Sequence, residues 1–350
     1  MKRSNAAKFA AVAAAGVLAL TACDNAADDG ASGGGDGETS SDVKVGLAYD
    51  VGGRGDRSFN DSAYRGLEQA AEELGVETND FEPADGEAES AKEERLATMA
   101  EEGYDVIIAV GFAYDAAVQA VAPEYPEVDF AIVDSEIEEI DNVTSLVFAE
   151  EQASFLAGAA AALTTDEDHV GFIGGVETPL IRKFEAGYVA GVAHVNEDIE
   201  VEINYLSQPP DFAGFNDPAQ GREAAQAQYD RGADVIYHAA GASGNGILQS
   251  AVDNEFTFIG VDSDQYENAE EEQKPYVLTS AIKQVDVSVF EFIRSATEGD
   301  VEAGIKRFDL SEGGVDYTLT NEEAIEPVQD QLDELKQQII DGEIEVPSQP

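Results

Sequence analysis

Short apolar runs alternate with helix-like stretches along the chain from residue 43 onward. The runs are nearly continuous in apolar residues, which predicts strands buried on both faces of a sheet. The predicted strands span 43–47, 106–110, 130–133, 170–173, 235–238, 256–261 and 277–282. The predicted helices include 62–74, 88–102, 114–122, 151–163, 180–196, 218–231 and 285–298. This alternation indicates an α/β protein with parallel sheets covered by helices on both faces.

Part of this pattern occurs twice. The segments from Glu102 to Gly111 and from Arg231 to Gly241 each carry Gly-x-Asp-Val-Ile, followed shortly by a glycine. Two copies, each within its own series of strands and helices, predict two lobes of similar topology. A ligand would then bind in the cleft between the lobes, where the carboxyl ends of the strands converge.

A glycine-rich turn over 48–60 follows the first predicted strand and precedes the first helix. Its three glycines allow the backbone to turn tightly, and Asp50, Phe59 and Asn60 are placed to reach a bound molecule. The alternative for Asp50 is that it only caps this turn.

The start of the chain has the pattern of a targeting segment. A basic start precedes an apolar stretch over 9–20, which is too short to span a bilayer as a helix. The run Leu20-Thr21-Ala22-Cys23 resembles the lipobox of bacterial lipoproteins, which implies that 1–23 is a signal peptide and that Cys23 is lipidated. The alternative is an ordinary signal peptide with an incidental cysteine. Residues 24–42, rich in Gly, Ala, Ser and Asp, are expected to form a flexible acidic tether.

Charge excludes some partners. The chain has 73 acidic and 19 basic residues, a formal net charge of -54. Such a field repels nucleic acids and anionic headgroups, so we expect neither as a partner. The acids are spread along the chain, which favours adaptation to high salt, where screening relieves self-repulsion. The alternative is an acidic extracellular protein without that adaptation.

No signature of catalysis emerges from the sequence. The loop Gly241-Ala242-Ser243-Gly244-Asn245 ends in Asn where a nucleophile elbow needs Gly. The three histidines, His169, His194 and His238, are not paired at metal-ligand spacing. We therefore predict a protein that is not an enzyme and needs no metal or cofactor.

Several spaced blocks, in a characteristic order, cover nearly the whole body of the chain. They are Asp50-Val51-Gly52-Gly53, Asp56-Arg57-Ser58-Phe59-Asn60, Phe130 to Asp134, Phe155 to Gly158, Val170 to Gly175, Phe184 to Tyr188, Phe215 to Pro218, Gly260 to Gln265 and Thr279 to Lys283. These blocks resemble the basic membrane protein (Bmp/PnrA/TmpC-like) family of ABC transporter substrate-binding lipoproteins.

The resemblance implies a type I periplasmic-binding-protein fold, with two doubly wound parallel-sheet lobes joined by a hinge. We expect the first lobe to contain 43–149 and about 279–304, and the second 150–278 and about 305–350. It also implies a purine nucleoside, or a similar small polar solute, as the ligand.

The resemblance further assigns residues to the ligand. Asp50 and Asn60 would bond the base, Phe59 and Phe215 would stack on it, Asp262 and Lys283 would hold the ribose hydroxyls, and Asp134, Gly174 and Gly241 would complete the site. A flat purine needs apolar faces, which aromatic rings supply. A diol needs an acceptor and a donor, which a carboxylate beside an ammonium supplies.

Each assignment has a simpler alternative. Phe59 and Phe215 would then be core residues, Lys283 would form a structural ion pair with Asp262, and the glycines would only shape the backbone. The loops at 208–211 and 241–245 depart from the family pattern, which leaves the base preference open.

We expect a monomer, lipid-anchored on the extracytoplasmic side of the cell membrane, that delivers its ligand to ABC permease subunits. The alternative is a ligand-sensing or surface adhesion receptor with the same fold. A hydrolase on this fold is a third class, and the sequence shows no nucleophile and base to support it.

Overall fold

The computed structural model describes residues 43–84 and 86–350. The predicted signal peptide and tether, with Cys23, lie outside the described residues. Within them, no helix combines the length and apolar character that a membrane span requires.

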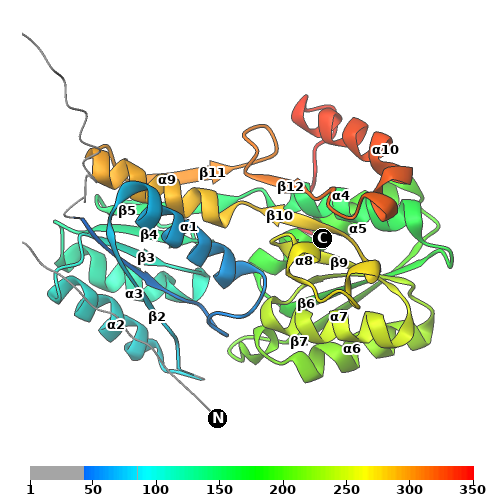
Figure 1. Cartoon of the computed structure of the whole chain (residues 1–350), viewed down its shortest axis with the longest axis horizontal. Helices are drawn as coiled ribbons and strands as arrows, with labels where there is room; N and C mark the ends of the chain where they lie inside the picture. The colour runs from blue at the N-terminus through cyan, green and yellow to red at the C-terminus, as the bar shows by residue number, and fades with distance from the viewer. Residues whose placement is uncertain (1–42, 85) are drawn as a thin grey trace, which may run out of the picture. The chain divides into compact units, whose positions relative to one another are not determined.

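The first sheet has six strands, all parallel, in the order β11-β5-β4-β3-β1-β2. Helices α1 and α9 pack together, as do α2 and α3. Figure 1 shows these elements around the blue and cyan strands. The elements of this lobe are β1 (Lys44–Ala48), α1 (Phe59–Leu74), β2 (Glu77–Phe81), α2 (Glu89–Glu101), β3 (Val106–Ala109), η1 (Phe112–Tyr114), α3 (Asp115–Val121), η2 (Ala122–Glu124), β4 (Asp129–Val133), β5 (Val143–Phe148), α9 (Val285–Glu298) and β11 (Gly304–Phe308).

The second sheet also has six strands, in the order β12-β10-β9-β8-β6-β7, and only the β10–β12 pairing is antiparallel. Helix α4 packs against α5, and α6 against α7. The elements of this lobe are α4 (Glu150–Thr164), β6 (His169–Val176), α5 (Pro179–Val195), β7 (Glu200–Ser207), η3 (Ala213–Phe215), α6 (Pro218–Arg231), β8 (Val235–Ala239), η4 (Gly241–Ser243), α7 (Gly244–Asn254), β9 (Thr257–Asp262), α8 (Gln265–Asn268), η5 (Lys274–Tyr276), β10 (Val277–Lys283), β12 (Val315–Tyr317) and α10 (Glu322–Ile340).

The two lobes repeat one topology. When the two strand orders are aligned, β1 corresponds to β6, β2 to β7, β3 to β8, β4 to β9, β5 to β10 and β11 to β12. The repeated sequence pattern falls on β3 and β8. Each of these strands leads to a 3-10 turn with a glycine at its start: Gly111 directly precedes η1, and Gly241 is the first residue of η4. The predicted fold class and internal repeat are confirmed.

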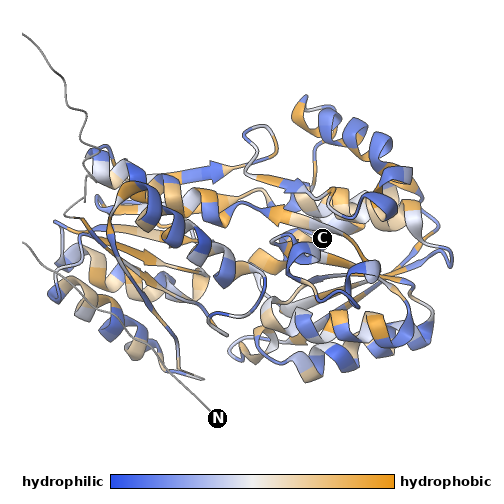
Figure 2. Cartoon of the chain, viewed as in Figure 1, coloured by the Kyte–Doolittle hydropathy of each residue, from blue (hydrophilic) through white to orange (hydrophobic). Residues whose placement is uncertain are grey.

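Both faces of the central strands are buried. In β3, Val106 and Ile108 belong to one apolar cluster and Ile107 and Ala109 to another, because successive side chains of a strand point to opposite faces. Figure 2 shows apolar strands between helices whose outer faces are hydrophilic. This two-sided burial explains why the central strands are continuous apolar runs.

The expected lobe boundaries need correction in the C-terminal part. Residues 277–283, expected mostly in the first lobe, form β10, which pairs with β9 of the second sheet. Residues 304–308, expected mostly in the second lobe, form β11, which pairs with β5 of the first sheet. The chain therefore crosses between the lobes after β5, after β10 and after β11. The apolar content of a strand does not specify which sheet it joins, since either sheet would bury it.

Several elements were not among the predictions. Strands β2, β7 and β11 lie at sheet edges or carry many polar residues, so they lack an apolar run. Helix α7 starts with Gly-Asn-Gly, which is a weak helix signal. Its glycines are required by packing, because a Cβ on Gly246 would lie 1.7 Å from the Pro218 carbonyl oxygen.

Candidate functional site

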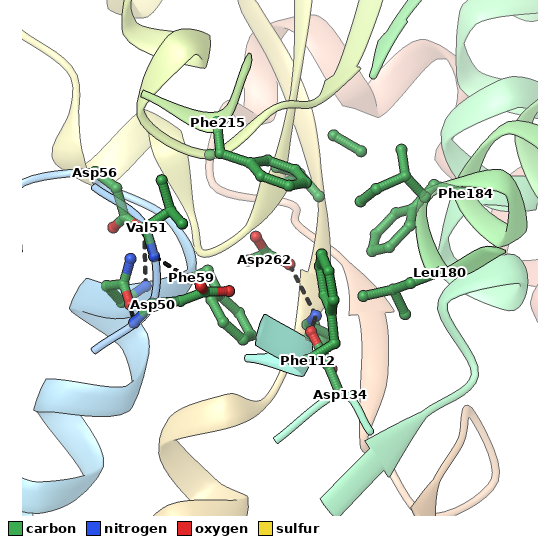
Figure 3. A pocket seen from close by; sticks show the side chains of 16 residues that line it. Asp50, Val51, Asp56, Phe59, Phe112, Asp134, Leu180, Phe184, Phe215 and Asp262 are labelled. Carbon is green, nitrogen blue, oxygen red and sulfur yellow. Dashed lines mark hydrogen bonds and ion pairs between the residues drawn. The ribbon is translucent and has the colours of Figure 1, made fainter. Parts of the chain in front are cut away.

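A cavity lies between the lobes, at the carboxyl ends of strands from both sheets. Its volume is about 60 Å³, room for a few water molecules. Figure 3 shows its side chains converging from the two lobes. The first lobe contributes Asp50, Val51, Asp56, Phe59, Asn60, Phe112 and Asp134, and the second contributes Leu180, Ile181, Phe184, Phe215, Ala239, Gly241, Val261, Asp262 and Lys283.

Nearly all the residues predicted to bind a ligand line this cavity. The exception is Gly174, in β6, where a Cβ would lie 2.5 Å from the ring of Tyr205. Gly174 therefore allows Tyr205 to pack and does not line the cavity. The predicted residues that the structure brings together are Asp50, Phe59, Asn60, Asp134, Phe215, Gly241, Asp262 and Lys283.

Phe59 and Asn60 are the first residues of α1, which begins three residues earlier than predicted. The buried carboxylate of Asp56 explains this early start. It accepts the backbone N–H groups of Ser58 at 2.9 Å, Asn60 at 2.8 Å and Asp61 at 3.1 Å. These N–H groups have no partner within the helix, so their capping stabilises its first turn.

Asp50 is held beside this helix start. Its backbone N–H donates to Asn60 Oδ1 at 3.1 Å, and its Oδ1 accepts the Val51 N–H at 2.7 Å. Gly111, at φ +92°, makes room for the other carboxylate oxygen, because a Cβ there would lie 2.0 Å from Asp50 Oδ2. Burial raises the pKa of Asp50 to about 7. Asp50 therefore bonds within its own turn, as the simpler alternative held, and also lines the cavity.

Lys283 connects carboxylates from the two lobes. Its Nζ lies 2.6 Å from Asp134 Oδ2 and 3.6 Å from Asp262 Oδ1, and all three side chains are buried. Burial alone would lower the pKa of Lys283, but Asp134, Asp262 and Glu150 together raise it above its ordinary value. The ammonium is therefore charged at neutral pH and compensates the buried carboxylates.

Two carboxylate oxygens at this end of the cavity are left without hydrogen bonds. Asp134 Oδ1 and Asp262 Oδ1 are buried, and neither has a hydrogen-bond partner among the described residues. Asp134 directly follows β4, and Asp262 is the last residue of β9, the equivalent strand of the other lobe. Both residues have φ above +60°. An unmatched buried acceptor is costly, so these two oxygens are the groups of the cavity that most need a hydrogen-bond donor.

Aromatic rings form the walls of the cavity. Phe59 lies under Lys283, with Nζ 4.5 Å from its ring centroid, and Phe215 contacts Phe112 edge-on at 6.2 Å between centroids. Phe215 takes its place because residue 175 is glycine: a Cβ there would lie 2.4 Å from the Phe215 ring. Phe112 belongs to the first lobe and Phe215 to the second, as Figure 3 shows.

The sequence analysis did not identify every residue of the site. Asp56 and Phe184 stand inside the family-like blocks but were not assigned to it. Phe112 follows Gly111, where the first copy of the repeated pattern ends. The second copy ends at Gly241, which was assigned to the site, so the repeat could have indicated the region of Phe112 as well. Glu150 adjoins the cavity in a neighbouring pocket with Asp134, and burial together with Asp134 raises the pKa of Glu150 to about 7.

The described residues provide no cluster of three or more His, Cys, Asp or Glu side chains that would hold a metal ion. The cavity itself combines aromatic side chains with buried carboxylates beside the Lys283 ammonium.

Comparisons with known proteins show which family this chain belongs to. The model of the Bmp family, described as ABC transporter substrate-binding protein PnrA-like, matches residues 43–350. A Lactococcus lactis protein named ABC transporter nucleoside-binding protein BmpA is 35% identical over 358 residues, covering 97% of each chain. A Pyrococcus abyssi protein named an uncharacterized lipoprotein is 34% identical over 286 residues, which is 79% of this chain and 69% of that protein.

A solved structure also matches. The ABC transporter solute-binding protein of Aeropyrum pernix K1 has a TM-score of 0.74 and 31% identity, and the match covers 87% of this chain and 93% of that one. The resemblance stated from the sequence blocks is confirmed, and the chain belongs to the Bmp family of PnrA-like ABC transporter substrate-binding proteins.

Proposed function

We propose that this protein is the lipid-anchored, extracytoplasmic receptor of an ABC importer and binds a purine nucleoside in the cavity between its lobes. The observation that carries the proposal is the pair of unpartnered buried oxygens, Asp134 Oδ1 and Asp262 Oδ1, beside the Lys283 ammonium.

A ribose can form hydrogen bonds with the charged groups Asp134, Asp262 and Lys283. Its hydroxyls donate to carboxylate oxygens and accept from an ammonium, and both kinds of bond are stronger than bonds between neutral groups. A ligand without hydroxyls would leave buried acceptors unmatched and would bind more weakly.

A purine suits the aromatic walls. Phe59 and Phe215 supply ring faces from the two lobes, with Lys283 over the Phe59 ring, and stacked aromatic rings gain about 0.5–1.5 kcal/mol beyond burial. The carboxylate of Asp50 would accept a base N–H. The Asn60 amide already accepts the Asp50 N–H through Oδ1, so its NH2 group would donate to the base.

On this proposal, binding of a nucleoside involves separation of the lobes. The cavity volume of about 60 Å³ is far below the roughly 300–1,000 Å³ of small-molecule sites. A nucleoside would therefore enter an opened cleft, and its contacts with both lobes would favour closure.

Anchoring and transport rest on sequence and family. The lipobox-like run that ends at Cys23 and the lipoprotein name of the Pyrococcus relative support the anchor. Family membership supports delivery to permease subunits. No feature of the described site favours the sensing, adhesion or hydrolase alternatives.

The test is calorimetry on the full chain, purified in detergent in molar KCl, with inosine, adenosine, guanosine, uridine, free bases and ribose. We expect saturable binding of the purine nucleosides only. Asp262→Ala should weaken that binding by about 10- to 100-fold, since it removes a charged acceptor.

Asp253→Ala is the matched control, because Asp253 is a half-exposed carboxylate paired with Arg222 on the surface of the second lobe. It should leave affinity unchanged. Binding of another solute in place of nucleosides would overturn the ligand assignment, and unchanged affinity in Asp262→Ala would overturn the ribose assignment.

A further inference from the structure

Ser58 occupies the N-cap position of α1 without capping it. Serine is favoured there because its hydroxyl accepts an N–H of the first helical turn. In this helix Ser58 makes no side-chain cap bond. The Asp56 carboxylate caps the turn instead, so the Ser58 hydroxyl is available for another contact.

That contact crosses to the second lobe. Ser58 Oγ donates to Asp262 Oδ2 at 2.7 Å and lies 3.2 Å from the carbonyl oxygen of Val261. Ser58 is fully buried and Asp262 is 7% exposed. A short hydrogen bond from a buried hydroxyl to a buried carboxylate is among the stronger ones in proteins.

A second hydrogen bond runs in the opposite direction. Ser263 Oγ donates to the backbone oxygen of Ser58 at 2.7 Å, and Arg65 donates to Ser263 Oγ at 3.0 Å. This bond also joins the lobes, but it does not touch the Asp262 carboxylate.

The orientation of Asp262 depends on few groups. Its Oδ2 is held by Ser58, while its Oδ1 faces Lys283 at 3.6 Å and has no hydrogen bond within the described chain. A carboxylate is planar, so fixing Oδ2 limits the directions in which Oδ1 points. Ser58 therefore sets where the unpartnered oxygen lies.

We propose that Ser58 is a positioning residue that aligns Asp262 for the hydroxyls of the ligand. This inference rests on the proposed function, in which Asp262 binds a ribose. Because Ser58 and Asp262 belong to different lobes, Asp262 is aligned only while the lobes are together, which ties recognition of the sugar to closure.

If the Ser58–Asp262 hydrogen bond only held the lobes together, its loss would have a different effect on ligand affinity. Weaker closure lowers the affinity for every ligand by the same factor. Misalignment of Asp262 lowers affinity only for ligands that carry the hydroxyl it binds. The ratio of affinities for inosine and for its 2′-deoxy and 3′-deoxy analogues therefore separates the two roles.

The experiment measures these ratios by calorimetry on the full chain for wild type, Ser58→Ala, Ser58→Thr, Ser263→Ala and Asp262→Ala. Asp262→Ala identifies the analogue whose missing hydroxyl Asp262 recognises. For Ser58→Ala we expect inosine affinity to fall about tenfold, with most of the preference for inosine over that analogue lost. Ser58→Thr keeps the hydroxyl and should keep the preference.

Ser263→Ala is the matched control, since it removes the other cross-lobe serine bond, and it should keep the preference. A Ser58→Ala protein that keeps the wild-type preference overturns the inference, whatever its absolute affinity. Equal loss of preference in Ser263→Ala also overturns it. If wild type binds inosine but Asp262→Ala changes neither affinity nor preference, the ribose assignment itself is lost, and a wild type that binds no nucleoside refutes the proposed function.

Discussion

Replacing Lys283 with methionine removes a buried ammonium while keeping a long unbranched side chain. The Asp134 and Lys283 side chains are each 4% exposed, and that of Asp262 is 8% exposed. Removing one partner of a buried ion pair costs about 3–5 kcal/mol, because the remaining charge is left uncompensated. We expect the free energy of unfolding of Lys283→Met to fall by about this amount at pH 8.

The loss should depend on pH. Burial already raises the pKa of Asp134 above its ordinary value, and Lys283 opposes that rise. Without the ammonium, the folded protein binds a proton at Asp134 more tightly than the unfolded chain does. Stability contributed by this proton is present at low pH and is lost as pH rises through the folded-state pKa. The deficit of Lys283→Met should therefore be smaller at pH 5 than at pH 8.

Urea unfolding in molar KCl, followed by circular dichroism, measures the effect. Lys336→Met is the matched control: its ion pair with Asp316 has the same 2.6 Å distance, but the side chains are 27% and 32% exposed. Exposed pairs contribute about 0–1 kcal/mol. Adding Asp134→Asn to Lys283→Met should recover part of the loss. A Lys283→Met deficit no larger than that of Lys336→Met, or one that does not change with pH, would refute this reasoning.

Three further predictions follow from the site and the charge. Gly175→Ala should displace the Phe215 ring, because the added Cβ would lie 2.4 Å from it, and calorimetry should show weaker nucleoside binding; unchanged affinity would remove Phe215 from the stacking pair. Because burial raises the pKa of Asp50 to about 7 and a base N–H would bond its ionised form, affinity should increase as pH rises from 6 to 8. Asp50→Asn should weaken that dependence, although Glu150, with its pKa also raised to about 7, titrates in the same range; an unchanged pH dependence would contradict the role of Asp50. With a net charge of -54, the midpoint of urea unfolding should rise with KCl as the Debye length falls from about 10 Å at 0.1 M to about 3 Å at 1 M; a midpoint that is insensitive to salt would contradict adaptation to high salt.

Much of the architecture was determined by local sequence. Most central strands were predicted from apolar runs, since a strand covered on both faces needs apolar residues at nearly every position. The exception is β5, an interior strand of the first sheet that was not predicted. The two lobes were predicted from one repeated pattern, which falls on β3 and β8. Eight of the sixteen residues that line the cavity were predicted through family-like blocks, and Gly174 was the one assigned residue that packs elsewhere.

Only the tertiary structure decided which sheet takes β10 and β11, and which groups meet in the cavity. Lys283 and Asp134 are 149 positions apart, and Ser58 and Asp262 are 204 apart. A serine before a helix predicts a cap from local chemistry alone. Its actual partner is set by the approach of another lobe, because a hydrogen bond depends on distance in space and not on distance along the chain.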